Sequence, residues 1–247
     1  AYAIMRNHYH LALETPDANL VEGMHWLQST FATRFNRYRA ERGHLFQGRY
    51  QAPLVEDAAA LLRVVNYIHL NPVRTGLIQP CGAATFRWGS LKRLVKGPRP
   101  PWLVAQTVLT QLALEDTAGG WVRYLAYLVA LAGDPRMQQQ QEFELLSHGW
   151  AIGTSGWRQA VAQEHAQLAL APEYERKQLR EIKEARWRGE LDRMLHERGL
   201  SLTESVKQAP PTGWKIEVAA ELRLRVGAPY QWMAEILRIN RPASLRM

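Results

Sequence analysis

The sequence predicts a fold that begins with a strand, continues with two helices and is mostly helical beyond residue 103. Residues 1–13 form a short, largely apolar run that carries two histidines one residue apart. Residues 20–42 repeat apolar side chains at intervals of three and four, which is the spacing of one helix face. The three prolines of KGPRPPWL (96–103) indicate a linker, and helical patterns dominate after it.

Composition excludes several classes of protein. Among the 247 residues no run of 18 or more is apolar, which excludes a membrane-spanning helix. No basic segment precedes a long apolar one, so we expect no signal peptide. Cys81 is the single cysteine, which excludes an internal disulfide framework and a cysteine zinc cluster. We therefore expect a soluble cytoplasmic protein without a membrane partner.

Positive charge is concentrated in the first part of the chain. The net charge is +8, and residues 1–102 hold 13 lysines and arginines against 6 aspartates and glutamates. Residues 103–247 are nearly balanced, with 18 against 17. A basic segment attracts nucleic acid, although a solvated basic surface would have the same composition.

The first predicted strand, residues 1–13, contains His8 and His10. Alternate residues of a strand point to the same face, so both imidazoles would project side by side. Such a pair can bind a divalent metal if a third ligand comes from elsewhere, and it can equally be structural. ETPDAN (14–19) predicts a turn, with Asp17 or Asn19 capping the next helix.

The first predicted helix, residues 20–42, ends in a cluster of arginines. Its apolar face would consist of Leu20, Met24, Leu27, Phe31, Phe35 and Tyr38. The clustered arginines are Arg34, Arg37, Arg39 and Arg42. Cations at a helix C-terminus also stabilise the helix dipole, so these arginines have a structural explanation as well.

The loop RGHLFQGRYQAPLVED (42–57) interleaves aromatic and basic residues around short extended pieces. It contains His44, Phe46, Arg49 and Tyr50. Such a mixture can stack on bases and hold phosphates, or it can pack as an ordinary loop.

The second predicted helix runs from residue 57 to residue 70, with Leu61, Leu62, Val65 and Ile68 buried. Pro72 is predicted to stop it, and NPVRTG (71–76) to form a turn. Tyr67 and Asn71 are four residues apart, so a helix would offer a hydroxyl and an amide to one place. Tyrosine is a poor nucleophile at its usual pKa near 10, and a metal that polarises a phosphate removes that obstacle. A half-buried tyrosine and a helix-capping asparagine are the structural alternative.

Helical patterns cover most of the remaining chain. They span residues 119–133, 137–147, the part of 149–168 after its glycines, and 172–199; KQAPPTG (207–213) indicates a second linker. Residues 214–240 have the pattern of a helix-turn-helix, or of an ordinary helical hairpin. The apolar face of its first helix would be Ile216, Ala219, Ala220 and Leu222, and that of its second helix Trp232, Met233, Ile236 and Leu237. If this segment binds DNA, the residues near the phosphates would be Arg238, Arg241 and Arg246.

Three blocks together resemble one family. MRNHYHLAL, RGHLFQGRYQAPLVED and YIHLNPVRTGL occur in the order and spacing of the REP-associated tyrosine transposases. These belong to the HUH single-tyrosine transposases, in which two histidines flank one hydrophobic residue, here His8, Tyr9 and His10. The resemblance is specific over about residues 1–102. It implies an α+β fold: an HUH-type antiparallel sheet with helices, followed here by a mostly α-helical C-terminal region.

The resemblance also implies residue roles. His8, His10 and Asn71 would bind Mg²⁺ or Mn²⁺, and Tyr67 would attack a DNA phosphodiester to form a 5′-phosphotyrosine. DNA-binding residues would be Arg34, Arg37, Arg42, Phe46, Arg49, Tyr50 and Arg74. The DNA partner would be single-stranded or folded into a stem-loop.

The predicted domains are a transposase domain (1–95), a helical extension (96–206) and a possible helix-turn-helix (207–247). Family members carry a strand and a helix before the histidine strand, whereas this sequence begins at Ala1 within it, so we expect an incomplete transposase domain. Two alternatives stay open: a nucleic-acid-binding regulator without catalysis, and a metal-dependent hydrolase of a small phosphoester. Only the transposase hypothesis predicts a covalent adduct through Tyr67.

Overall fold

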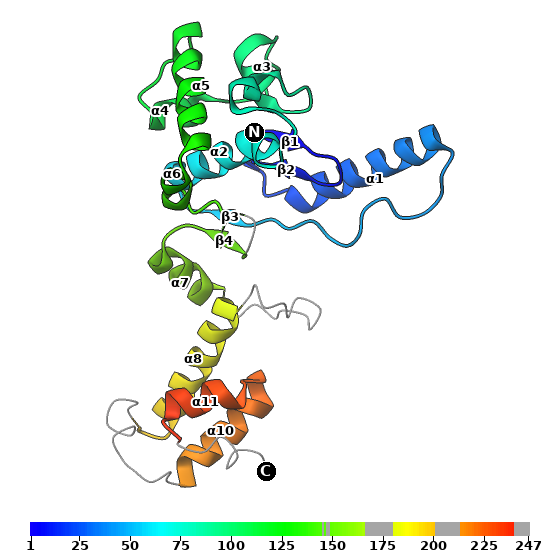
Figure 1. Cartoon of the computed structure of the whole chain (residues 1–247). Helices are drawn as coiled ribbons and strands as arrows, with labels where there is room; N and C mark the ends of the chain where they lie inside the picture. The colour runs from blue at the N-terminus through cyan, green and yellow to red at the C-terminus, as the bar shows by residue number, and fades with distance from the viewer. Residues whose placement is uncertain (145, 147–148, 166–179, 201–212, 240–247) are drawn as a thin grey trace. The chain divides into compact units, whose positions relative to one another are not determined.

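The computed structural model describes residues 1–144, 146, 149–165, 180–200 and 213–239, and these form two compact units (Figure 1). The first unit is Ala1–Gly153 and the second is Thr154–Met247. The first combines a small sheet with helices and the second is helical, which confirms the predicted fold class.

The histidine segment is a β-hairpin, so the single strand predicted over residues 1–13 is wrong. Strands β1 (Tyr2–Ile4) and β2 (Tyr9–Leu11) pair antiparallel, with Ala3 opposite His10. The Met5 amide donates to the His8 carbonyl at 2.8 Å, which closes the turn between the strands. Asparagine favours turns, and Asn7 lies inside this one.

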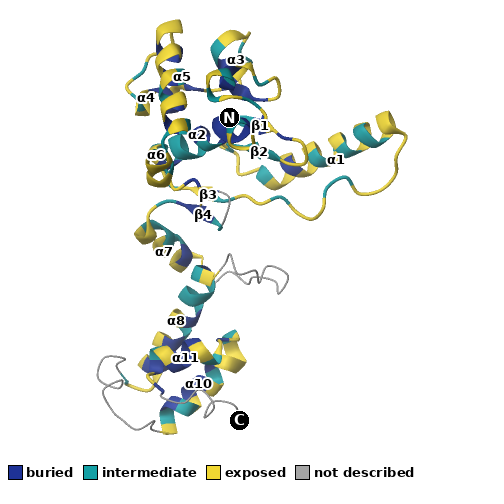
Figure 2. Ribbon diagram, viewed as in Figure 1, coloured by how far each residue is buried: buried dark blue, intermediate teal, exposed yellow. Residues whose placement is uncertain are grey.

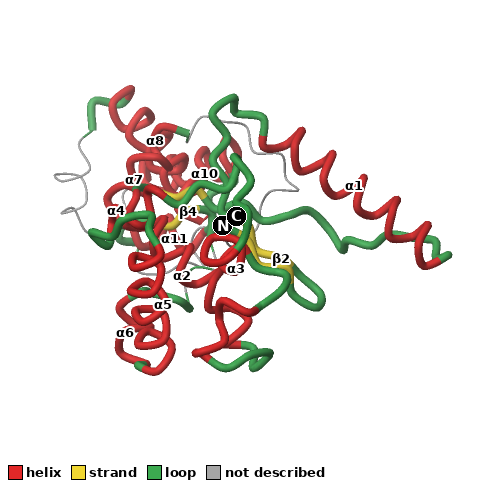
Figure 3. The backbone as a smooth tube through the Cα atoms, turned by 90° about the horizontal axis from the view of Figure 1, so that it is seen from above, coloured by secondary structure: helices red, strands yellow, loops and turns green. Residues whose placement is uncertain are grey.

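Helix α1 (Leu20–Arg39) ends three residues earlier than predicted, because Ala40 adopts a left-handed conformation with φ of 54°. Asn19 is its N-cap residue, but the Asn19 side chain makes no capping hydrogen bond. Only Met24 of the predicted apolar face is buried, whereas Leu27, Phe31 and Tyr38 are exposed (Figure 2). Figure 3 shows α1 and the loop after it extending away from the other helices of this unit.

The predicted loop over residues 42–57 is confirmed, including its extended piece. Strand β3 (Leu54–Val55) pairs in parallel with β4 (Ala151–Ile152). This pairing joins the end of the loop to the last residues of the first unit.

Helix α2 (Ala58–Arg74) passes through Pro72, so the predicted stop at that proline is wrong. A proline removes its own amide donor and crowds the preceding turn, yet the next bond is kept, since Thr75 N donates to the Asn71 carbonyl at 3.0 Å. Residues 71–74 are therefore helical, and the predicted turn is confined to Thr75 and Gly76. At the start of the helix, the Asp57 carboxylate accepts from Ala60 N at 2.7 Å and caps it.

Helix α2 is the central element of the first unit. Val65 and Ile68 are buried as predicted, whereas Leu61 and Leu62 are half-buried. Around it lie the 3-10 helix η1 and four α-helices: η1 (Pro80–Thr85), α3 (Ser90–Lys96), α4 (Gln106–Gln111), α5 (Ala118–Gly133) and α6 (Pro135–Gln140). Helix α5 agrees with its prediction. Of the helix predicted over 137–147, α6 covers residues 137–140 and residues 141–144 form turns, while residues 145 and 147 lie outside the described residues.

The proline-rich stretch 96–103 lies inside the first unit. Leu103 is 3% exposed and belongs to the same hydrophobic core as α2 and α5. The three-domain division proposed from the sequence stays a prediction.

The second unit is built from α7 (Ser155–Glu164), α8 (Arg180–Glu197), α10 (Gly213–Val226) and α11 (Tyr230–Leu237). Helix α8 covers the described part of the charged helix predicted over 172–199. The two predicted helices within 214–240 are confirmed as α10 and α11, which pack with α8 on one core. Ala220 is exposed, however, so its predicted place on the apolar face is wrong. Arg238 is exposed, and Arg241 and Arg246 lie outside the described residues.

Candidate active site

His10 lies at the meeting point of the hairpin and helix α2. Its ring centre is 5.0 Å from that of His8 and 5.3 Å from that of Tyr67, with the rings edge to face in both pairs. The Asn71 amide nitrogen donates to His10 Nε2 at 3.1 Å. The structure thus brings the two histidines, the tyrosine and the asparagine of the sequence prediction to one place.

Helix geometry explains why Tyr67 and Asn71 face the hairpin together. They are one turn apart on α2, and the i and i+4 side chains of a helix share a face. The hairpin places His10 opposite Ala3, and Ala3 packs in a small cluster with Ile68 and Tyr67. The histidine face of the hairpin is therefore the face that packs on α2.

Burial keeps His10 in its neutral form. Desolvation lowers the pKa of His10 to about 4, and the charges of His8 and Arg74 act in the same direction. An amide nitrogen can only donate, so the lone pair of His10 Nε2 accepts from Asn71, and a metal bound at this nitrogen would replace that hydrogen bond. A neutral imidazole is the form that binds a metal.

The donor set of this site fits a divalent metal. Asn71 Oδ1 is buried and has no hydrogen-bond partner among the described residues. His8 Nδ1 lies 2.8 Å from Asn7 Oδ1, an acceptor, which leaves the other ring nitrogen of the exposed His8 available. Two imidazoles and a carboxamide oxygen suit Mg²⁺ or Mn²⁺ when water and phosphate complete the shell. Throughout the parts of the chain that the structure describes, no three His, Cys, Asp or Glu side chains gather as metal ligands, and this site offers two histidines and one amide.

Arg74 places a positive charge beside Tyr67. The guanidinium carbon is 4.9 Å from the centre of the Tyr67 ring and 5.2 Å from that of Phe143. Phe143 is buried and contacts Tyr67 edge to face at 5.7 Å. The Tyr67 ring is therefore held between His10 and Phe143, with a cation on its face.

A further histidine, His69, carries no signal in the sequence pattern. It lies on the opposite side of α2 from Tyr67 and is 4% exposed. Its ring nitrogens lie 2.9 Å from the Tyr124 hydroxyl and 3.1 Å from Ser90 Oγ, and burial lowers its pKa to about 3. Ser90 Oγ also accepts from Tyr2 N at 2.9 Å, so His69 links α2 to α5, α3 and β1.

The remaining predicted DNA-binding residues lie on α1 and the loop after it. Arg34, Arg37, Arg42 and Arg49 are exposed, whereas Phe46 and Tyr50 are half-buried. Phe46 contacts the Tyr9 ring at 6.1 Å and the Phe31 ring at 6.2 Å, so it packs between hairpin and helix. The Tyr9 hydroxyl accepts from Gln28 at 2.8 Å, on the side of the hairpin that faces α1.

None of the helices in the described residues is both long enough and apolar enough to cross a bilayer.

Comparison with known proteins identifies the part of the chain that holds this site. Residues 1–71 match the family model described as "Transposase IS200 like". No curated protein and no solved structure is significantly similar to the chain. The match ends at Asn71, so it includes both histidines, the tyrosine and the asparagine. Residues 1–71 are therefore an IS200-like transposase domain, of a family of HUH tyrosine transposases that are generally DNA endonucleases and typically depend on a metal.

Proposed function

We propose that this protein cuts and rejoins single-stranded DNA at palindromic repeat elements through a 5′-phosphotyrosine on Tyr67. The observation that carries the proposal is the contact of His10 with both Tyr67 and Asn71. The three sequence blocks shared with the REP-associated transposases support the choice of a palindromic element as substrate.

Tyr67 would supply the nucleophilic oxygen. Its hydroxyl attacks the phosphorus of a phosphodiester, a bond forms between the phenolic oxygen and phosphorus, and the bond from phosphorus to the 3′ oxygen breaks. The phenol loses one proton and the departing 3′ oxygen gains one, so the step is balanced. Attack by the released 3′-hydroxyl on the phosphotyrosine reverses these changes and rejoins the strand.

His8, His10 and Asn71 would hold the divalent cation next to the tyrosine. The bound cation would supply Lewis-acid polarisation of the phosphate. His10 reaches this position from β2, and Asn71 reaches it from the same helix as the nucleophile. Because His10 is neutral, binding a cation there requires no loss of a proton from it.

The basic residues would hold the rest of the strand. Arg34, Arg37, Arg42 and Arg49 would contact phosphates along α1 and the loop after it, with Tyr50 stacking on a base. Arg74, next to Tyr67, would contact the phosphate that reacts.

The test is the covalent adduct formed by the full chain with stem-loop single-stranded DNA and Mn²⁺. We expect an adduct whose proteolytic peptide carries a phosphotyrosine at Tyr67. The Tyr67→Phe variant should form none and should bind the same DNA with nearly unchanged affinity, because the substitution keeps the ring between His10 and Phe143.

A Tyr50→Phe variant is the matched control, since Tyr50 lies in the basic loop and is also half-buried. It should still form the adduct. An adduct at Tyr50 would show that the nucleophile is misassigned. DNA binding without any adduct would favour the non-catalytic regulator, and hydrolysis of a small phosphoester without an adduct would favour the hydrolase.

A further inference from the structure

Two tryptophans of the first unit are exposed next to the hairpin. Trp88 is 53% exposed and Trp102 is 69% exposed. Large aromatic side chains are usually buried, so neighbouring exposed ones indicate a binding surface. Neither tryptophan belongs to the site around Tyr67.

Backbone pairing places Trp88 on the hairpin. Ala3 pairs antiparallel with Gly89, and Ile4 N donates to the Trp88 carbonyl at 2.9 Å. Trp88 precedes the bridging residue Gly89, so its backbone lies beside Ile4, next to the hairpin face that carries Ile4. Ile4 is in turn opposite Tyr9. This face is the reverse of the one that carries His10, because successive residues of a strand alternate between faces.

Trp102 extends the same surface. Its ring centre lies 6.4 Å from that of Tyr2, which shares a face with Ile4 because the two are two residues apart in β1. We call Tyr2, Ile4, Trp88 and Trp102 the tryptophan face. Ile4 is 48% exposed, so this face of the hairpin is open at Ile4 as well.

The loop that carries Trp102 is fixed in position. Leu103, the next residue, is buried and donates to the Pro100 carbonyl at 2.9 Å. On the other side, Arg99 pairs with Asp116, including a hydrogen bond of 2.8 Å, and Asp116 also accepts from the Trp121 indole at 2.8 Å. The indole of Trp102 is therefore presented on an anchored loop, which lowers the entropy that a ligand must overcome to use it.

The charge around this face is positive. Arg87 lies over the Trp88 ring, with its guanidinium carbon 4.7 Å from the ring centre. Lys92, Arg93 and Lys96 are exposed on α3, and none of them forms an ion pair among the described residues. Residues 58–114 contain no aspartate or glutamate at all. Exposed aromatic rings beside unpaired cations are the combination that binds single-stranded nucleic acid.

We propose that the tryptophan face binds a single-stranded segment of nucleic acid, with bases stacked on Trp88 and Trp102 and phosphates near Arg87 and α3. The ligand class rests on the proposed function. The site is separate from that of Tyr67, because it lies on the reverse face of the hairpin. Stacking depends little on which base is stacked, so this surface would bind a strand in its single-stranded form whatever its sequence.

The test distinguishes contacts to the bases from contacts to the phosphates. Two labelled oligonucleotides of equal length are compared by fluorescence anisotropy in EDTA: oligo-dT, and an abasic strand with the same phosphates. We expect Trp88→Ala and Trp102→Ala each to weaken oligo-dT binding by about 5- to 100-fold, the usual range for one stacked base. Binding of the abasic strand should stay unchanged. Arg87→Ala should weaken both ligands and reduce the slope of log affinity against log salt by about 0.7.

Trp26→Ala is the matched control, since Trp26 is 66% exposed on α1 and lies outside the tryptophan face. It should leave both affinities unchanged, and Trp88→Phe should keep most of the oligo-dT affinity because it keeps a ring. The proposal is wrong if Trp88→Ala and Trp102→Ala leave oligo-dT binding unchanged, weaken both ligands equally, or act no more strongly than Trp26→Ala.

These outcomes are independent of the adduct test. If Trp88→Ala and Trp102→Ala leave oligo-dT binding unchanged while the native chain forms the Tyr67 adduct, only the tryptophan face is overturned. Base-dependent binding in a chain that forms no adduct supports the tryptophan face and overturns only the catalytic role of Tyr67.

Discussion

His10 shows how one side chain depends on two elements. Its position in β2 brings it to Tyr67, and α2 supplies both the ring it contacts and the amide that donates to it. Its pKa of about 4, lowered first by burial, leaves it neutral at physiological pH. Protonation therefore competes with metal binding at His10 only in strongly acidic solution.

Arg74 is the residue whose substitution tests the electrostatics of the site. Its guanidinium lies over the Tyr67 ring and is exposed, so it can contact a phosphate bound at the tyrosine. We expect Arg74→Ala to slow adduct formation about 100-fold in single-turnover experiments, as for the loss of one donor to a developing charge. Arg74→Lys should recover part of the rate because it keeps the charge without the planar fork.

Arg123→Ala is the control for this prediction, since Arg123 is exposed on α5. It should leave the rate of adduct formation unchanged. A rate for Arg74→Ala equal to that of the Arg123 variant would show that Arg74 takes no part in the reaction.

Spacing along one element was enough to predict part of this site. Tyr67 and Asn71 follow from the helical repeat, because both lie on the same helix. His69 could not be predicted in the same way, since its partners Tyr124 and Ser90 lie 55 and 21 residues away along the chain. A lone histidine on a helix gives no sign of such distant hydrogen bonds.

At the level of helices and strands, the sequence predictions are wrong where a local sequence signal and tertiary packing favour different structures. Pro72 is a strong helix breaker in isolation, yet α2 continues past it because Pro72 is buried and the Asn71 carbonyl before it still accepts from Thr75 N. The hairpin was missed because Asn7 is a single turn residue within an otherwise strand-forming run. Helix α1 was predicted correctly because its periodic pattern is long, although that pattern did not predict how exposed its apolar face is.

The ion pair of Arg99 and Asp116 joins the proline-rich loop to α5 and gives the first unit a pH dependence. The hydrogen bond from Arg99 lowers the pKa of Asp116, burial opposes this, and the hydrogen bond from Trp121 lowers it further. A lowered pKa in the folded state means that the carboxylate stabilises the fold above the unfolded pKa of about 3.9. This contribution is lost as the pH falls through the folded value.

We therefore expect Asp116→Asn to lower the free energy of unfolding by about 1 kcal/mol at pH 7. The change is small because the side chains of the pair are about one-third exposed to solvent. The difference from the native chain should shrink below pH 4, as measured by urea unfolding between pH 7 and pH 3. Asp17→Asn, in an exposed turn, is the control and should show no such trend. A difference that is the same at pH 3 and pH 7 would contradict the role of the carboxylate charge.

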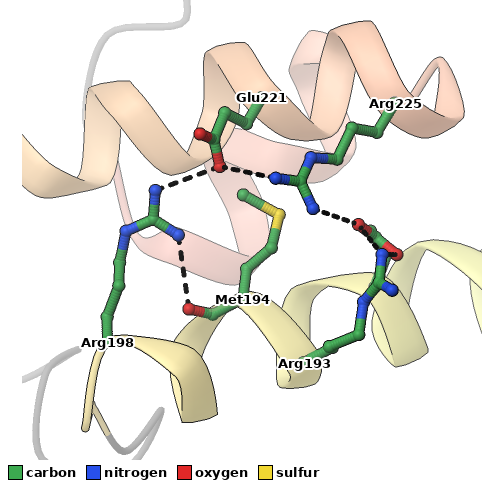
Figure 4. A network of polar contacts seen from close by, with 6 residues as sticks. Arg193, Met194, Arg198, Glu221 and Arg225 are labelled. Atoms are coloured by element: carbon green, nitrogen blue, oxygen red, sulfur yellow. Dashed lines mark hydrogen bonds and ion pairs between the residues drawn. The ribbon is translucent and has the colours of Figure 1, made fainter.

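At the scale of the whole molecule, the two units differ in the arrangement of their charges and have separate hydrophobic clusters. The basic excess lies within residues 1–102, whereas in the second unit Arg158, Arg198 and Arg225 form ion pairs between different helical segments of that unit. Figure 4 shows Arg225 of α10 and Arg198, the residue after α8, on the Glu221 carboxylate. Arg225 also pairs with Glu190 of α8 at 3.1 Å. Such partly exposed pairs orient α8 and α10 and add little stability on their own, so the core supplies most of it.

Each hydrophobic cluster of the described residues draws all its members from one unit. Leu222 of α10 is fully buried in a cluster with α8 and α11, and Leu128 of α5 is fully buried in the cluster around α2. Truncating either leucine should cost about 2 to 5 kcal/mol, from lost burial and the cavity that remains. Because the clusters have no member in common, each loss should stay within its own unit.

Hydrogen exchange measured by mass spectrometry tests this independence. Leu222→Ala should speed exchange in α8, α10 and α11 and leave α2 and α5 at their native rates, whereas Leu128→Ala should do the reverse. Adduct formation by the first unit should likewise survive Leu222→Ala, because Tyr67, His10 and Asn71 all lie in that unit. Faster exchange in α2 and α5 of the Leu222 variant would show that the two units unfold together.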